Sequence, residues 1–263
     1  MHHPWRRLIP VLACCCLLPA LVAGPGRAAP PISRQAAALM GKARPRLERE
    51  LAGRGLHLGA PIFIRIFKIP ATLEVWMHKG AAFTLFKKYP ICSYSGFPGP
   101  KLHEGDWQSP EGFYSVPASR MNPNSSYHLA FNIGYPNEFD QQWSRTGSSI
   151  MVHGECSSRG CFAMGNPGME EIYLLAHSAL AAGQQQFSVH VFPFPLTDAN
   201  LAKYRSSPWI DFWQSLQPGY LAFERTRTVP VITVQNGAYV VREAATRLAL
   251  VRTGKKGGDD GGD

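Results

Sequence analysis

The sequence predicts a mixed, mostly β fold with one main α-helix and a small C-terminal α/β extension. Between residues 62 and 86, three short runs of β-branched and aromatic side chains alternate with a period of two, as strands do. Residues 168–182 instead place apolar side chains on one face of a helix, and Gly183 ends that pattern. The chain of 263 residues is long enough for one well-buried domain with appendages.

Residues 1–29 form a predicted signal peptide. Arg6 and Arg7 give it a positive start, residues 8–23 are its apolar core, and small residues around Ala28 offer a cleavage site. The apolar run is short and is interrupted by Pro10 and Pro19, so a membrane span is not expected in the mature protein. The segment predicts secretion, with lipidation of Cys14 as the second alternative.

The mature protein is basic. The full chain has 27 Lys and Arg against 18 Asp and Glu, a net charge of +9, and the signal peptide takes away three arginines and no acid. A basic surface suits an anionic polymer. Because a secreted chain does not routinely meet nucleic acid, we expect no nucleic-acid partner and favour a bacterial wall or an anionic membrane surface.

The first half of the mature chain predicts a helical lead-in followed by a β-rich domain. The lead-in covers residues 30–60, with a helix over residues 33–51 that Pro45 is expected to break. The main domain covers residues 61–195 and begins with an antiparallel meander that turns at residues 79–80. Further strands are expected at residues 112–116, 128–133, 149–152 and 187–192.

The C-terminal part predicts an extension and a tail. The extension, residues 196–245, is rich in aromatic side chains, which indicates core packing or a cover over a substrate groove. Asp198 is a candidate cap of a short helix, and residues 229–241 predict a hairpin that turns at Asn236 and Gly237. The tail, residues 246–263, is polar and is expected to be disordered.

One stretch, residues 153–164, concentrates reactive side chains. It places His153, Cys156 and Cys161 among hydroxyls and glycines, directly after the apolar run at residues 149–152. A thiol becomes a strong nucleophile when a neighbouring base or a positive field favours its thiolate. Gly160 precedes Cys161 and would let backbone N–H groups approach a developing oxyanion. The stretch is therefore a candidate active site.

Two other interpretations of these residues stay open. A free cysteine is often an inert, buried side chain, and a single histidine is more often structural than catalytic. His153, Cys156 and Cys161 could also be three zinc ligands, although no further Cys pair or His-x-x-x-His lies nearby to complete a structural site. Cys156 is a second candidate nucleophile, but no glycine precedes it.

The run His-Gly-x-x-x-Ser-x-Gly-Cys at residues 153–161 resembles the signature of the L,D-transpeptidase (YkuD-type) family, which acts on bacterial peptidoglycan. The resemblance implies that Cys161 is the nucleophile, His153 the base and Gly160 part of the oxyanion loop, with Ser158 and Arg159 binding substrate. Many members carry a second histidine where this chain has Arg159. That difference, and the sequence of residues 162–164, match the YafK-like branch of the family.

Two further motifs extend the resemblance over about residues 61–195. Residues 105–112 contain Gly-Asp followed by Ser-Pro-Glu-Gly, and residues 132–137 read Asn-Ile-Gly-Tyr-Pro-Asn. Both stretches are similar to segments of the same branch. A YkuD-like β-sheet domain is the fold that this implies.

The resemblance also implies an activity. Family members carry out cysteine acyl chemistry on peptidoglycan stem peptides at the L-centre of diaminopimelate, in the periplasm and without a metal or other cofactor. The branch implies a hydrolase (amidase) that releases wall-linked protein, for which an outer-membrane lipoprotein is the candidate partner. The alternative is a transpeptidase that forms peptidoglycan or peptidoglycan–protein cross-links.

The cysteine count fits a single working thiol. Once the signal peptide is removed, three cysteines remain, and an odd number in an oxidising compartment predicts one disulfide and one free thiol. With Cys161 as nucleophile, Cys92 and Cys156 are expected to pair.

Two rival classes of protein stay open. One is a papain-like peptidase, in which the Cys precedes the His in the sequence, and the other is a non-catalytic wall-binding module.

Overall fold

The computed structural model describes residues 29–243. The predicted signal peptide, apart from Ala29, and the predicted tail at residues 246–263 lie outside the described residues. The described chain contains two five-stranded sheets, a two-stranded hairpin and five α-helices, which confirms the mixed, mostly β fold class. None of its helices combines the length and the apolar character needed to cross a bilayer.

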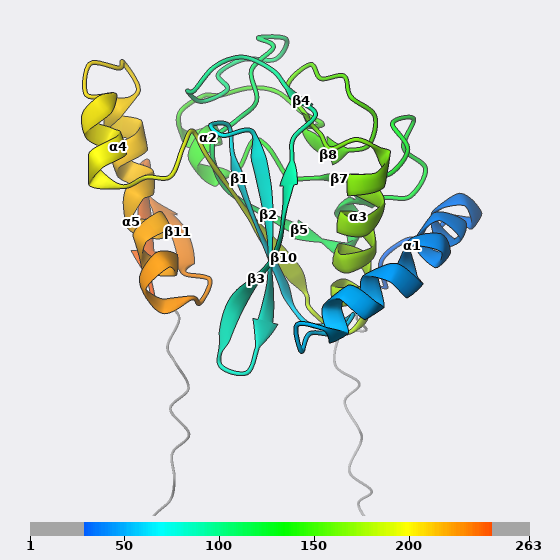
Figure 1. Cartoon of the computed structure of the whole chain (residues 1–263). Coiled ribbons are helices and arrows are strands. Elements are labelled where there is room, and N and C mark those ends of the chain that lie inside the picture. The colour runs from blue at the N-terminus through cyan, green and yellow to red at the C-terminus, as the bar shows by residue number, and fades with distance from the viewer. Residues whose placement is uncertain (1–28, 244–263) are drawn as a thin grey trace, which may run out of the picture.

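The main sheet has the strand order β3-β2-β1-β10-β5 (Figure 1). Its strands are β1 (Ile62–Phe67), β2 (Thr72–Lys79), β3 (Ala82–Pro90), β5 (Gly112–Pro117) and β10 (Gln186–Phe192). The predicted antiparallel meander is confirmed, because β2 pairs antiparallel with both β1 and β3. The late strand β10 lies between β1 and β5; it is parallel to β1 and antiparallel to β5.

A second sheet of short strands carries the reactive stretch. Its order is β4-β9-β8-β7-β6. The strands are β4 (Ser93–Tyr94), β6 (Met121–Asn122), β7 (Ala130–Asn132), β8 (Met151–His153) and β9 (Phe162–Ala163), and the 3-10 helix η1 (Ala118–Arg120) precedes β6. Because β8 and β9 are parallel, the loop between them must return to the level at which β8 begins.

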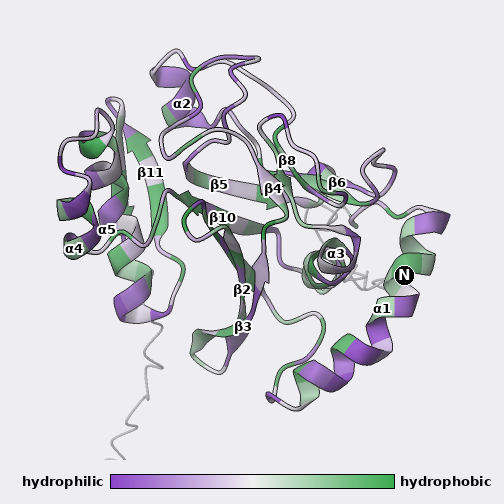
Figure 2. Ribbon diagram, turned by 45° about the horizontal axis from the view of Figure 1, so that its top comes forward, coloured by the Kyte–Doolittle hydropathy of each residue, from purple (hydrophilic) through white to green (hydrophobic). Residues whose placement is uncertain are grey.

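Helix α3 (Asn166–Ala181) lies in the core beside both sheets, and α1 (Arg34–Ala52) packs against it (Figure 2). The predicted break of α1 at Pro45 is wrong, since the helix continues through it. Pro45 removes one backbone hydrogen bond. The helix nevertheless buries an apolar stripe that includes Met40, Leu47 and Leu51, and the burial of these side chains outweighs that loss.

The C-terminal extension covers the other face of the main sheet. It consists of α4 (Asp198–Lys203), α5 (Ile210–Thr226) and the hairpin of β11 (Val231–Gln235) and β12 (Ala238–Arg242), which turns where the sequence predicted. Trp213 and Tyr220 pack with Phe67, Phe113 and Phe192 of the sheet, so the aromatic side chains form a second core. Thr197, rather than Asp198, caps α4, because its side-chain oxygen accepts the Asn200 N–H.

A buried ion pair joins the extension to the loop that leads into β5. Lys68 and Glu111 are fully buried and lie 3.1 Å apart. Glu111 also accepts a hydrogen bond of 2.7 Å from the Gly99 N–H and one of 2.8 Å from the Trp213 indole N–H. One carboxylate therefore links the main sheet, the loop of residues 95–111 and α5. A short helix, α2 (Glu138–Gln142), packs nearby and begins at Asn137, which forms a capping box with Asp140.

Candidate functional site

His153 and Cys161 come from neighbouring parallel strands. Val152 pairs with Phe162, and His153 pairs with Ala163, which places Cys161 beside Met151. Side chains two residues apart in a strand share a face, and in-register neighbours on a parallel strand share it too. The imidazole and the thiol therefore project from the same face of the β8–β9 pair, as diagonal neighbours.

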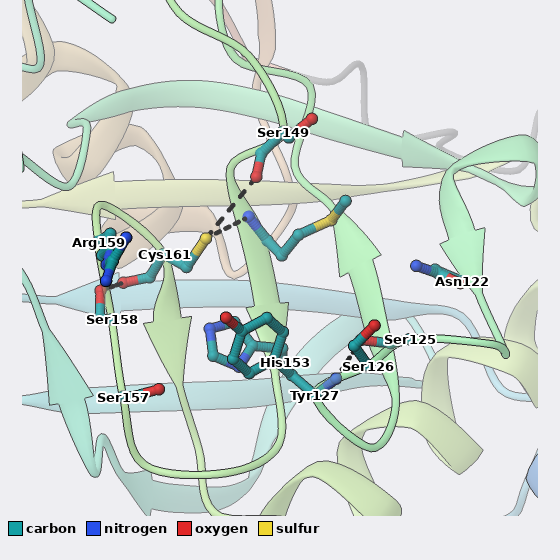
Figure 3. A pocket seen from close by; sticks show the side chains of 11 residues that line it. Asn122, Ser125, Ser126, Tyr127, Ser149, His153, Ser157, Ser158, Arg159 and Cys161 are labelled. Carbon is teal, nitrogen blue, oxygen red and sulfur yellow. Dashed lines mark hydrogen bonds between the residues drawn. The ribbon is translucent and has the colours of Figure 1, made fainter. Parts of the chain in front are cut away.

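Both side chains line one open pocket of about 530 Å³ (Figure 3). The pocket lies between the loop before β9 and the segment between β6 and β7. Most of its lining residues have polar side chains, and Arg159 is the one with a permanent charge. The lining residues are Asn122, Ser125, Ser126, Tyr127, Ser149, Met151, His153, Ser157, Ser158, Arg159 and Cys161.

The Cys161 thiol is partly buried and is the free cysteine of the described chain. The Met151 N–H donates to its sulfur at 3.4 Å, and the sulfur lies 3.7 Å from the Ser149 carbonyl, to which it donates. Burial raises the pKa of the Cys161 thiol, although the Met151 N–H and the positive charge of Lys101 act in the opposite direction. At neutral pH the resting side chain is therefore a thiol rather than a thiolate, and nucleophilic attack by its sulfur would require a base.

His153 lies on the same face of the β8–β9 pair and is the candidate base. Only 3% of the residue is exposed, and the Tyr127 ring lies over the imidazole at 4.9 Å between centroids. Burial lowers the pKa of His153, against the raising effects of the Gly154 carbonyl and of Glu155, so the ring is neutral at pH 7. Its Nδ1 lies 2.5 Å from the Gly154 carbonyl, which can only accept; this assigns the proton to Nδ1 and leaves Nε2 as a base.

Gly160 shapes the loop in front of the thiol. Its φ of +111° is in the range that glycine tolerates best. A Cβ there would also crowd the Gln108 carbonyl and the Ile150 side chain, each at 3.3 Å. The Gly160 N–H donates to the hydroxyls of Ser95, at 3.0 Å, and Ser158, at 3.2 Å. The Cys161 N–H has no such partner among residues 29–243, which leaves it open to a substrate oxygen.

Ser158 and Arg159 both line the pocket but differ in their contacts. The Ser158 hydroxyl donates to the Cys161 carbonyl at 2.7 Å and lies 2.8 Å from the Ser95 hydroxyl, so it is engaged within the protein. The Arg159 guanidinium lies over the Trp107 ring, 5.1 Å from its centroid. It is exposed and free to meet an anionic group of a ligand.

The sequence analysis missed four residues around the thiol. Ser95 and Ser109 bind the backbone of Gly160 and Cys161 from the loop of residues 95–111. Lys101 supplies positive charge near the sulfur. The Tyr127 ring packs against the His153 imidazole. Ser109 and Lys101 lie in the Gly/Pro-rich block that carried part of the resemblance, but nothing in the sequence showed that this block folds back onto Cys161.

Cys92 and Cys156 form a disulfide, with their Cα atoms 5.3 Å apart. Cys92 lies between β3 and β4, and its N–H donates to the Ala163 carbonyl of β9. The bond attaches the loop between β8 and β9 to the short connection between β3 and β4. The disulfide uses the sulfur of Cys156, which was one of the three candidate zinc ligands. Residues 29–243 contain no cluster of three His, Cys, Asp or Glu side chains suited to a metal.

Comparisons with known proteins identify the family of the chain. The model of the YkuD family, the L,D-transpeptidase catalytic domain, matches residues 66–180. YafK of Escherichia coli (strain K12), a protein classed among the L,D-transpeptidases, is 45% identical over 184 residues, which are 70% of this chain and 75% of YafK.

Solved structures give weaker likenesses. The helical cell shape determining protein Pgp2 (K307A mutant) of Campylobacter jejuni aligns with a TM-score of 0.43 and 20% identity, over 73% of this chain and 66% of Pgp2. Bd1075 of Bdellovibrio bacteriovorus aligns with a TM-score of 0.37 and 16% identity, over 67% of this chain and 78% of Bd1075. On the extent of its identity with YafK and the match of its core to the YkuD model, the chain belongs to the L,D-transpeptidase family, in its YafK-like branch.

Proposed function

We propose that this protein is a periplasmic cysteine acyltransferase that acts on peptidoglycan stem peptides at the L-centre of diaminopimelate. The observation that carries the proposal is that His153 and Cys161 share one face of the β8–β9 pair and line one pocket. Family membership supplies the class of substrate. The predicted signal peptide supplies the compartment, and the domain covering residues 61–195 is the proposed catalytic unit.

The first half of the reaction forms a thioester. Nε2 of His153 takes the proton of the Cys161 thiol while the sulfur bonds to the substrate carbonyl carbon. The Cys161 N–H, which is unoccupied, donates to the oxygen as it becomes negative. The imidazolium then returns the proton to the leaving amine, and the C–N bond breaks. Gly160 contributes through the shape of its backbone, because its own N–H is bonded to two serine hydroxyls.

The second half resolves the thioester with water or with an amine. Water gives a carboxylate and the free thiol, so the enzyme is a hydrolase; an amine gives a new amide, so it is a transpeptidase. The pocket is open, and six of its eleven lining residues carry hydroxyl groups, which gives water access to the site. We favour hydrolysis of the amide that joins diaminopimelate to a lysine of a wall-linked lipoprotein. Transpeptidation is the second candidate, because the same site serves both directions.

The deciding experiment uses purified sacculi that carry covalently bound lipoprotein. The mature protein is incubated with the sacculi, the soluble fraction is analysed by mass spectrometry, and the muropeptides are separated. Lipoprotein that ends in a free lysine supports hydrolysis. New diaminopimelate–diaminopimelate cross-links without released lipoprotein support transpeptidation. The Cys161→Ala protein is the matched control, and equal release by this variant would contradict both.

The same control separates an enzyme from a wall-binding module. A non-catalytic module would bind sacculi and leave the muropeptide pattern unchanged, and its Cys161 would be replaceable. A thiol-reactive probe on the native protein adds a second readout, since the proposed nucleophile is the described chain's free cysteine and opens into the pocket.

A further inference from the structure

Trp107 is an exposed aromatic side chain that the structure holds at the edge of the catalytic pocket. The residue is 57% exposed. Its guanidinium neighbour, Arg159, lines the pocket and lies over the indole, 5.1 Å from the ring centroid. Trp107 thus stands beside the site that contains Cys161 without belonging to its lining.

The backbone at Trp107 is in an unfavourable conformation. Its φ is +54°, in the left-handed region, where a bulky side chain costs on the order of 1 kcal/mol or more. The flanking residues hold it there. The Asp106 carboxylate accepts the N–H groups of Leu102, His103 and Gln108 and pairs with Lys101 at 2.5 Å. An exposed ring and a strained backbone at one residue point to selection for something that the ring contacts.

A second exposed ring is tied to the same loop. Phe97 is 82% exposed. The Gln108 side chain holds its backbone on both sides, accepting the Phe97 N–H at 3.1 Å and donating to the Phe97 carbonyl at 2.6 Å. Gly96 allows this approach, because a Cβ there would lie 1.8 Å from the Gln108 side chain. Phe97 and Trp107 are therefore presented by one cross-linked segment, which keeps the entropy cost of ligand binding low.

We propose that Phe97 and Trp107 form a binding platform for the glycan strand of the wall polymer, at the edge of the catalytic pocket. A pyranose ring has a flat face of C–H groups, which stacks on an aromatic face, and a rim of hydroxyl and acetamide groups, which bond to polar side chains. The Arg159 guanidinium, which lies over the Trp107 ring, is such a polar group.

The chemistry favours sugar over protein as the occupant. A protein anchor normally fills an apolar socket, whereas here the rings project from the surface and six of the eleven residues that line the adjacent pocket carry hydroxyl groups. The inference rests on the proposed function only for the identity of the polymer. In peptidoglycan the stem peptide is attached to the glycan, so a glycan site must lie at the rim of the pocket that receives the peptide.

The test measures binding separately from catalysis. The mature chain carries Cys161→Ala to prevent turnover, and the probe is insoluble glycan from which an amidase has removed all stem peptides. Trp107→Ala and Phe97→Ala should each weaken sedimentation with this glycan about tenfold, the factor that 1.4 kcal/mol gives. Trp107→Phe keeps an aromatic face and should retain most of the binding. Trp143→Ala is the matched control, since Trp143 is 60% exposed but lies on the α2 side.

Kinetics on the protein with Cys161 intact give an independent readout. Phe97→Ala should raise KM for polymeric sacculi about tenfold and leave both KM and kcat for a glycan-free stem peptide unchanged, because Phe97 contacts neither Arg159 nor the residues that line the pocket. No binding of the parent protein to peptide-free glycan, or an equal rise of KM for the glycan-free peptide, would overturn the proposal. If Trp107→Ala bound soluble lipoprotein less well than the parent protein but bound glycan equally well, the proposal would be overturned in favour of a protein partner. Glycan binding without any turnover would instead reject the proposed function alone.

Discussion

The hydroxyl of Ser109 donates to the carbonyl of Cys161 at 3.2 Å, across 52 positions of sequence. Ser109 is fully buried and also accepts the Ser95 N–H at 3.1 Å. Ser95, in turn, accepts the Gly160 N–H. The loop of residues 95–111 therefore fixes the backbone on both sides of the thiol, and the proposed oxyanion contact at the Cys161 N–H depends on it.

Ser109→Ala should lower kcat/KM about tenfold by loosening this backbone. It leaves the partly buried Ser95 N–H without a partner, so the free energy of unfolding should fall by about 1 kcal/mol. Urea denaturation and steady-state kinetics measure the two effects. Ser206→Ala, at an exposed site between α4 and α5, is the control and should change neither. Wild-type kinetics in Ser109→Ala would show that the hydrogen bond is not needed.

Substitution of the two reactive side chains should have unequal effects. Cys161→Ala should abolish turnover, because no other free thiol lies in the pocket. His153→Ala should lower kcat by about 100-fold or more, the usual contribution of a general base, while the Cys161 thiol can still be alkylated. Both are measured on sacculi and by iodoacetamide labelling with peptide mapping. Activity retained by Cys161→Ala would reject the mechanism.

The pH dependence follows from the two burial effects. The pKa of His153 lies below its ordinary value of about 6.5. A base must be unprotonated, so kcat/KM should stay high as pH falls through 6.5 and decline only at lower pH. The pKa of Cys161 lies above the ordinary cysteine value of about 8.5, so iodoacetamide labelling should accelerate with pH up to at least that value. A labelling rate that is already constant between pH 5 and 7 would instead indicate a preformed thiolate–imidazolium pair.

Local sequence patterns predicted much of the fold because they report local physics. Alternation predicted the strands of the meander, and the Asn236-Gly237 pair predicted the C-terminal hairpin; both are confirmed. The break predicted at Pro45 was wrong because helix propensity describes an isolated helix, whereas α1 is stabilised by the side chains that it buries. The parallel pairing of β10 with β1 joins segments more than a hundred residues apart, and alternation carries no information about such partners.

The site was predictable only where its residues are near one another in sequence. His153, Gly160 and Cys161 lie within nine positions, and the spacing alone made them candidates. Ser95, Lys101, Ser109 and Tyr127 approach Gly160, Cys161 or His153 from loops whose course depends on tertiary packing. The engagement of the Gly160 N–H by two hydroxyls is likewise a result of that packing. It moves the proposed oxyanion contact to the Cys161 N–H.

The disulfide between Cys92 and Cys156 should stabilise the fold and protect the nucleophile. The two cysteines are 64 positions apart, and closing a loop of that length in the unfolded chain is worth about 4 kcal/mol in the chain-entropy model. Cys92→Ser should therefore lower the free energy of unfolding by about 2–4 kcal/mol under non-reducing conditions. It should also leave Cys156 free, five positions from Cys161 in a loop no longer held to the sheet, where it can form a disulfide with the nucleophile.

The double variant Cys92→Ser, Cys156→Ser is the control: it should be equally destabilised but keep its thiol active. Urea denaturation compares the stabilities, and mass spectrometry of non-reduced peptides identifies the bonds. A Cys156–Cys161 bond in the wild-type protein, or equal inactivation of the single and double variants, would contradict the protective role.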